Sequence, residues 1–282
     1  MRLLFLLLFC FGLFPVSAQQ WQRDFKQAQK ISLAANKLML VDFWAPWCNP
    51  CKRMDRESWS DPEVQKLLED FVPVKVNIET DLSTTKTYKV RSIPHIFIMD
   101  ANGEVVFSAN SYMPRSRVIE ILKKYALSTQ FMQRDAIGFF QHNNYVTGFR
   151  LAGKYLDFSL HLDEAIRNDF LNLARIYLDK GGDLLDKEQD NYLSMQHKLE
   201  LMTAIGDLYQ QDFRRVRRSL ENMDFEKLDA GNQVLYAYLS LGLSLDEQSP
   251  HQTQRWRSYL EEHNEAYLKR FDLLAAQVAR EK

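Results

Sequence analysis

Cysteine is scarce in this chain of 282 residues, which contains only Cys10, Cys48 and Cys51. Cys10 lies in an apolar N-terminal segment that we expect to be removed, so the mature protein would keep one Cys-x-x-Cys pair. One pair excludes a framework of structural disulfides. It also provides too few thiolates for a four-ligand zinc site, and the histidines from His142 onward show no metal-ligand spacing. We therefore expect no metal and no cofactor.

An excess of charge and long apolar runs are also missing from most of the chain. The formal net charge is −1 and charged residues make up 26% of the sequence. This balance predicts no general affinity for nucleic acid or for an acidic membrane. An apolar content of 46% is typical of a globular protein, and the length favours about two domains.

The first eighteen residues have a different character. Arg2 precedes an unbroken apolar run over residues 3–14, and Val16 and Ala18 place small residues before a possible cleavage point. Residues 1–18 are therefore predicted to be a secretory signal peptide cut after Ala18. A membrane anchor is the alternative, although a span needs about 20 residues. We expect an exported, periplasmic protein that contacts a membrane only through an uncleaved signal.

The remaining Cys-x-x-Cys pair follows an apolar run, residues 39–45, that reads as a buried strand. Cys48 would stand where this strand turns into a helix, whose N-terminus stabilises a thiolate. Cys51 would lie one turn later, close enough to attack a mixed disulfide formed at Cys48. We expect Cys48 to be the more exposed, attacking thiol and Cys51 to be the shielded, resolving thiol. This arrangement suits thiol–disulfide exchange.

Apolar periodicity predicts an α/β arrangement for residues 19–128. The expected helices are 22–37, 51–58, one that starts at Asp61-Pro62, and one around 118–125, and the expected strands are 39–45, 72–78, 96–99 and 104–108. Asp100-Ala101-Asn102-Gly103, between the last two strands, is a strong hairpin signal. Helices must then cover both faces of a small mixed sheet.

Proline is absent from residue 115 to residue 249, and eight of the ten glycines lie between residues 138 and 242. Residues 129–282 are therefore predicted to form an all-helical domain. The expected helices are 131–142, 145–158, 162–180, 187–210, 212–223, 230–244, 252–263 and 265–280, with breaks at 142–144, 181–182 and 249–250. The pairs faintly resemble tetratricopeptide hairpins, but no clean 34-residue period is present, so an ordinary bundle is equally compatible.

The stretch around the cysteine pair resembles the active site of the thioredoxin superfamily. The shared features are Asp42 six residues before the first cysteine, Trp44, Trp47, Lys75, and the pair Ile93-Pro94 at the family's cis-proline site. Residues 60–66 are more similar to the thioredoxin-like domains of bacterial envelope thiol:disulfide interchange proteins. The resemblance covers roughly residues 21–127 and implies a thioredoxin fold there.

The resemblance also implies roles for individual residues. Cys48, Cys51 and Asp42 would be catalytic, with Asp42 exchanging a proton with Cys51. The substrate-binding residues would be Trp47, Ile93 and Pro94. Lys75 would support Asp42 as its partner charge. The residues alone leave alternatives open: a solvated edge-strand carboxylate, an outward-facing lysine, and an ordinary proline at the start of a strand.

Three departures from thioredoxin lie near the cysteines. Asn49 replaces the usual glycine between them, and residues 110–113 lack the glycine that lets substrates approach closely. His95 follows the proline where a small hydroxyl residue is usual. It would either support the site by stabilising a thiolate or make a surface contact.

The expected function is exchange or reduction of disulfides in envelope proteins by an exported thiol–disulfide oxidoreductase. Its partners would be protein substrates with disulfides or thiols and a second thiol protein that exchanges electrons with it. The alternative is an interaction or chaperone-like protein whose helical region binds a partner and whose cysteine pair is a redox latch. The run Arg214-Arg215-Val216-Arg217-Arg218 would be either a solvated helix face or a docking patch.

Overall fold

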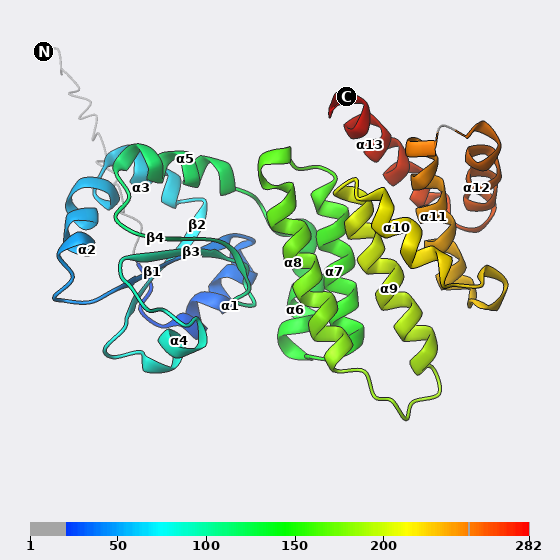
Figure 1. The fold of residues 1–282 in the computed structure, drawn as a ribbon. Coiled ribbons are helices and arrows are strands. Elements are labelled where there is room, and N and C mark those ends of the chain that lie inside the picture. The colour runs from blue at the N-terminus through cyan, green and yellow to red at the C-terminus, as the bar shows by residue number, and fades with distance from the viewer. Residues whose placement is uncertain (1–20, 248, 282) are drawn as a thin grey trace, which may run out of the picture.

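The computed structural model describes residues 21–247 and 249–281. The predicted signal peptide, residues 1–18, lies outside these residues. A sheet covered by helices comes first in the chain, and a region made only of helices follows it (Figure 1). Within the described ranges, no helix has both the length and the apolar character needed to cross a membrane.

A four-stranded mixed sheet forms the first part. Its strands are β1 (Leu38–Trp44), β2 (Phe71–Asn77), β3 (His95–Met99) and β4 (Val105–Asn110), in the order β2-β1-β3-β4. β1 pairs in parallel with β2 and antiparallel with β3, which pairs antiparallel with β4. Strand β1 is buried along almost its whole length, which explains why its residues are apolar apart from Asp42. The hairpin predicted between β3 and β4 is confirmed.

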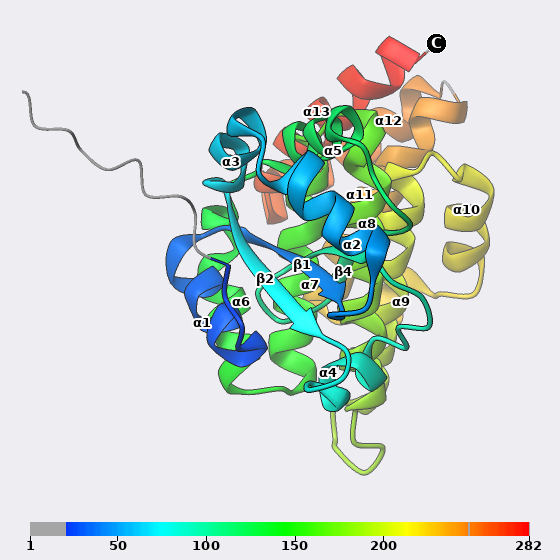
Figure 2. The same cartoon turned by 90° about the vertical axis from the view of Figure 1, so that its left-hand side faces the viewer.

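Helices cover both faces of this sheet, as predicted. They are α1 (Phe25–Ala35), α2 (Asn49–Met54), the π-helical turn η1 (Asp55–Trp59), α3 (Pro62–Leu68), α4 (Leu82–Thr87) and α5 (Arg115–Tyr125). Figure 2 shows α2, α3 and α5 on one side of the strands and α1 and α4 on the other.

Two details of the helical cover differ from the sequence prediction. The helix expected at 51–58 starts at Asn49, and its last turn widens into the π-helix η1. Helix α4 was not predicted, because none of its residues is buried and it therefore carries no apolar periodicity. Its local signal is Asp81, whose side chain accepts a hydrogen bond from the backbone N–H of Thr84 at 3.0 Å.

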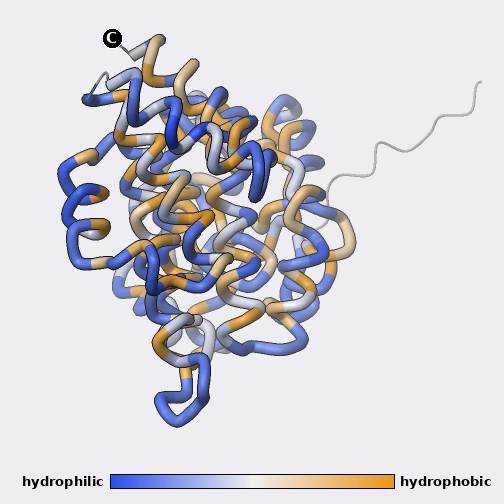
Figure 3. The backbone as a smooth tube through the Cα atoms, turned by 90° about the vertical axis from the view of Figure 1, so that its right-hand side faces the viewer, coloured by the Kyte–Doolittle hydropathy of each residue, from blue (hydrophilic) through white to orange (hydrophobic). Residues whose placement is uncertain are grey.

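The second part of the described chain is helical throughout. Its elements are η2 (Gln130–Met132), α6 (Gln133–Gln141), α7 (Tyr145–Ser159), α8 (Glu164–Asp183), α9 (Tyr192–Tyr209), α10 (Phe213–Glu221), η3 (Phe225–Lys227), α11 (Ala230–Glu247), α12 (Pro250–His263) and α13 (Ala266–Glu281). Neighbouring helices pack in pairs, α7 with α8, α9 with α10 and α11 with α12. The connection between α8 and α9 is mostly hydrophilic and projects from the body (Figure 3).

The break predicted at Gly181-Gly182 is wrong, because α8 continues through both residues to Asp183. Gly181 lies against the ring of Phe149 on α7. A Cβ atom at residue 181 would sit 2.7 Å from that ring. This glycine therefore permits close packing of α7 against α8 and does not end a helix.

The hairpin turn between β3 and β4 is buried against the helical region. Asp100 is 1% exposed, and its Oδ2 accepts hydrogen bonds from the hydroxyls of Tyr155, at 2.9 Å, and Tyr177. Its Oδ1 accepts the backbone N–H groups of Asn102 and Glu104 at 3.0 and 2.9 Å. Both carboxylate oxygens are therefore satisfied, by two helices on one side and by the turn on the other.

The apolar core is also continuous between the two parts. Tyr125 at the end of α5 belongs to the same buried cluster as Met132, Phe139 and Phe149 of the helical region. Lys180 on α8 makes an ion pair with Glu104 of the hairpin. We propose that residues 19–128 and 129–282 are two domains, and these contacts join their described parts through one shared core.

Asp100→Asn tests the cost of this buried carboxyl. Burial raises the pKa of Asp100 to about 6, against about 3.9 for an exposed aspartate. The folded protein therefore holds this proton more tightly than the unfolded chain does. The group's contribution to stability is present below pH 4 and falls by about 3 kcal/mol as the pH rises through 6. Urea unfolding between pH 4 and pH 7 should show a loss of stability that is smaller in Asp100→Asn than in the wild type by this amount, because other buried carboxyls such as Asp42 still ionise in the variant.

The matched control is Asp190→Asn, in the exposed loop after α8. Its unfolding free energy should follow the wild-type curve over the same pH range. Parallel curves for the wild type and Asp100→Asn would contradict the account.

Candidate active site

Strand β1 leads directly into the cysteine pair. The chain turns after Trp44, and Cys48 becomes the N-cap of α2, with Pro50 in the first helical turn. The backbone N–H of Cys51 donates a hydrogen bond to the Sγ of Cys48 at 3.1 Å. This bond and the partial positive charge of the helix N-terminus both favour a thiolate at Cys48.

Cys48 and Cys51 form a disulfide. Each residue is only 2% exposed, so the prediction that Cys48 is the more exposed thiol is wrong for this oxidised form. The pair packs with Ala45 and against the side chains of Ile78 and Ile93. Because the covalent bond holds both sulfurs inside the same turn, neither one projects into solvent.

The Ile93–Pro94 peptide bond is cis and lies immediately before β3. Pro94 is buried, and Ile93 is half-buried against the cysteine pair. Residues about forty positions apart in the sequence are therefore brought together, as the resemblance predicted.

Asp42 and Lys75 lie opposite one another in the parallel register of β1 and β2. Asp42 is 2% exposed, and its Oδ2 lies 3.2 Å from the Nζ of Lys75. Burial raises the pKa of Asp42, and the ammonium of Lys75 offsets part of that rise. Asp42 is therefore a buried carboxyl and not a solvated edge residue, and Lys75 points inward.

Asp55, on η1, is the residue that sequence reasoning missed at this site. Its carboxylate makes an ion pair with the Nζ of Lys75, and its charge raises the pKa of Asp42. Lys75 is thus shared by two carboxylates. The sequence prediction placed residue 55 in a helix without a partner, because its contact with Lys75 joins residues that are 20 positions apart in the chain.

Trp47 and His95, both predicted to lie beside the cysteine pair, have different surroundings. Trp47 is 61% exposed beside Cys48, and its Nε1–H donates to Glu79 at 2.9 Å. The ring of His95 stacks on Phe97 with centroids 4.2 Å apart, and burial lowers its pKa. The neutral imidazole is therefore favoured, which does not fit stabilisation of a thiolate by a charged His95.

Tyr112 occupies the segment that lacks the expected glycine. Its hydroxyl donates to Glu57 at 2.7 Å, and the guanidinium of Arg53 lies 4.3 Å from its ring centroid. These contacts attach the segment to α2 and η1.

Residues 21–247 and 249–281 contain no cluster of three or more histidine, cysteine or acidic side chains placed to hold a metal.

Comparison with known proteins agrees with this geometry. A family model described as a thioredoxin-like domain matches residues 25–126. The thioredoxin of Mycoplasma genitalium is 34% identical over 102 residues, which cover 92% of that protein and 35% of this chain. This chain belongs to the thioredoxin family. The thioredoxin of Pyropia yezoensis is a further similar protein, 35% identical over 94 residues that cover 81% of its length and 32% of this chain.

Thiol:disulfide interchange proteins are also similar to this thioredoxin family member. DsbD of Salmonella typhi is 34% identical over 80 residues, which cover 27% of this chain and 14% of DsbD. Among solved structures, a thioredoxin from Thermus thermophilus matches with a TM-score of 0.36 and 21% identity, over 40% of this chain and 91% of the other. The oxidised C-terminal domain of Neisseria meningitidis DsbD matches with a TM-score of 0.34 and 20% identity, over 38% and 99%.

The first part of the chain is thus a thioredoxin-like redox domain of the thiol–disulfide oxidoreductase class. Its redox pair is Cys48 and Cys51.

Asp55→Asn tests whether η1 adjusts the buried carboxyl. The charge of Asp55 raises the pKa of Asp42 and also attracts Lys75. We therefore expect a lower pKa for Asp42 in Asp55→Asn, measured by carboxyl-carbon NMR titration of the oxidised protein. Ionisation of Asp42 would then cost less stability as the pH rises through its folded pKa.

Glu57→Gln is the matched control, because Glu57 lies on the same turn but bonds to Arg53 and Tyr112. It should leave the pKa of Asp42 unchanged. A pKa that is unaltered by Asp55→Asn, or lowered equally by Glu57→Gln, would refute a role for Asp55.

Proposed function

We propose that this protein is an exported thiol–disulfide oxidoreductase that reduces or exchanges disulfides of cell-envelope proteins. The observation that carries this proposal is the Cys48–Cys51 disulfide at the N-terminus of α2, next in the chain to a strand that holds the buried Asp42. A nucleophile, a resolving thiol and a proton-exchanging group are the parts that the reaction requires.

In the reducing direction, the thiolate of Cys48 attacks one sulfur of a substrate disulfide. A mixed disulfide forms, and the other substrate sulfur leaves as a thiolate that takes up a proton. Cys51 transfers its proton to the carboxylate of Asp42, and its thiolate then attacks the Sγ of Cys48. The second substrate thiolate leaves, so two electrons pass from the cysteine pair to the substrate. A second thiol protein restores the reduced pair by the reverse chemistry.

The substrate chain is proposed to bind across the rim beside the cysteines. Trp47 supports this with its exposed ring, and Ile93 with its contact to the pair before the cis bond to Pro94. The backbone groups of Ile93 would pair with the substrate chain in the manner of a short β-bridge. Lys75 would limit the cost of ionising Asp42 during proton exchange.

Export is proposed from the N-terminal sequence. The apolar run over residues 3–14, followed by small residues at positions 16 and 18, supports a cleaved secretory signal. In an oxidising compartment the cysteine pair could cycle between thiols and disulfide. The mature chain would contain no other cysteine to compete with it.

Cys51→Ala tests the exchange reaction. This variant keeps the attacking thiol but cannot resolve a mixed disulfide, so we expect substrate proteins to accumulate on Cys48 in covalent complexes that dithiothreitol releases. Cys48→Ala is the matched control and should trap none. The wild type should also catalyse insulin reduction by dithiothreitol. Absence of turnover, although both reduced thiols react with an alkylating reagent, would refute the enzyme proposal.

Export gives a separate prediction. When the chain is produced in a bacterium with its own N-terminus, the periplasmic fraction should contain a protein that begins at Gln19 by intact-mass measurement. Ala18→Phe places a bulky residue before the cleavage point and should leave the leader attached. Recovery of the uncut wild-type chain from the cytosol would contradict export without affecting the redox chemistry.

A further inference from the structure

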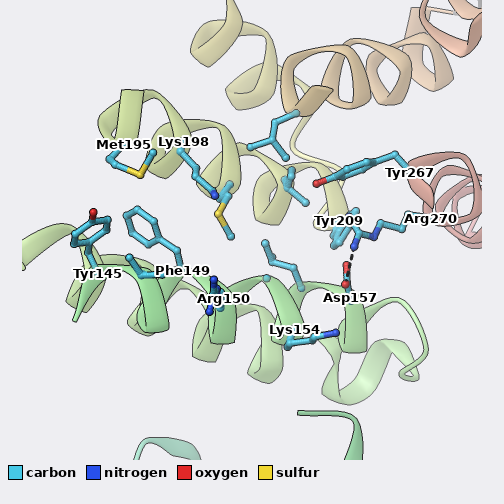
Figure 4. A pocket seen from close by; sticks show the side chains of 16 residues that line it. Tyr145, Phe149, Arg150, Lys154, Asp157, Met195, Lys198, Tyr209, Tyr267 and Arg270 are labelled. Atoms are coloured by element: carbon cyan, nitrogen blue, oxygen red, sulfur yellow. Dashed lines mark hydrogen bonds and ion pairs between the residues drawn. The ribbon is translucent and has the colours of Figure 1, made fainter. Parts of the chain in front are cut away.

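A cavity of about 370 Å³ opens between helices of the second part, far along the chain from the cysteine pair. Its volume lies in the range of ligand sites, about 300–1,000 Å³. Helices α7, α9, α11 and α13 contribute to its wall (Figure 4). Much of that wall is aromatic or thioether surface, from Tyr145, Phe149, Met195, Met202, Tyr209 and Tyr267.

The charged residues of the wall are mostly basic. Arg150, Lys154, Lys198 and Arg270 line the cavity, and Asp157 is its single acidic residue. Asp157 is already paired with Arg270 at 2.8 Å. Three cations therefore remain without a carboxylate from the wall, although the whole chain has a net charge of −1. This local excess of positive charge is not a property of the average surface.

Two of these cations are free to bind a ligand. Arg150 on α7 and Lys198 on α9 have no ion pair or hydrogen bond with the rest of the described chain. Figure 4 shows Lys198 extending from α9 toward α7, the helix that carries Arg150. Lys198 is half-buried, and its side chain forms part of the cavity wall.

Two basic residues on α10 differ from these two. In the arginine run of α10, Arg215 pairs with Asp212, and Arg217 pairs with Asp246 and Glu247. These pairs neutralise part of the run, and neither Arg215 nor Arg217 lines the cavity. Unpaired cations beside an apolar wall instead identify the cavity as a place for a ligand that is both anionic and apolar.

We propose that this cavity binds an acidic peptide segment of a partner protein. The guanidinium of Arg150 and the ammonium of Lys198 would bind carboxylates of the segment, and neighbouring apolar side chains would cover the aromatic and methionine wall. A small inorganic anion would leave that wall in contact with water. The choice of a peptide rests on the proposed function, because the redox domain acts on proteins and shares one core with these helices.

The experiment uses the full-length mature chain in its oxidised form and a short fluorescein-labelled peptide in which glutamate alternates with leucine and phenylalanine. Fluorescence anisotropy should show saturable binding that weakens as salt increases. The same peptide with glutamine in place of glutamate should bind at least about tenfold more weakly, because the charge-assisted contacts are lost. Arg150→Glu and Lys198→Glu should each weaken binding by about tenfold or more.

Arg214→Glu is the matched control, an exposed cation on α10 outside the cavity. It should bind the glutamate peptide as the wild type does. Equal affinity for the glutamine peptide, an equal loss in Arg214→Glu, or no binding would overturn the proposal. Binding only to vesicles of anionic phospholipid, lost in Arg150→Glu, would also overturn it.

The titration contains no disulfide substrate, so its outcome does not depend on catalytic turnover. Failure of peptide binding with active insulin reduction refutes the peptide site alone. Peptide binding without insulin reduction refutes the redox function alone.

Discussion

The redox site depends on one interaction: the ammonium of Lys75 is shared by the carboxylates of Asp42 and Asp55. A carboxyl as deeply buried as Asp42 is costly to ionise unless a cation lies close by. Lys75 provides that cation from the neighbouring strand, and the parallel register of β1 and β2 places the two residues opposite one another. Asp55 on η1 pairs with the same ammonium, and its negative charge raises the pKa of Asp42. The ammonium of Lys75 therefore offsets only part of the cost of ionising Asp42. The raised pKa of Asp42 supports its proposed role as the proton acceptor for Cys51.

The buried turn between β3 and β4 fixes the position of the sheet relative to the helical region. Asp100 accepts hydrogen bonds from tyrosines on α7 and α8, and the cores of the two parts are continuous. A flexible tether would let the helical cavity move independently of the cysteine pair. Here a partner segment held in the cavity would be presented from a constant position relative to the redox site, which raises the effective concentration of its thiols or disulfides.

Much of the redox site could be predicted because its signals are local or periodic. The cysteine turn follows an apolar strand, Asp42 is the one charged residue in that strand, and the Asn102-Gly103 turn separates two apolar runs. The positions of Lys75 and the cis-proline came from the family resemblance. Each of these features has a recognisable sequence pattern, so the structure around Cys48 could be predicted.

The remaining features depend on tertiary contacts that the order of residues does not record. Asp55 pairs with Lys75, a residue 20 positions later in the chain, and no local pattern indicates this contact. Gly181 serves the packing of two helices, although a glycine pair usually signals a helix end. Cys48 is as buried as Cys51 in the disulfide form, which the spacing of the two cysteines does not reveal. Arg150 and Lys198 converge on one cavity from different helices, which no spacing within α7 or α9 reveals.

The central claim is that Cys48 and Cys51 form one reversible redox pair. Its most direct test is equilibration of the purified mature protein with mixtures of reduced and oxidised glutathione, followed by alkylation and mass measurement of each cysteine. The account predicts a single two-electron transition in which both thiols appear and disappear together, with the same midpoint from the reduced and the oxidised side. Independent titration of the two cysteines, or a disulfide that stays closed at every glutathione ratio, would contradict it.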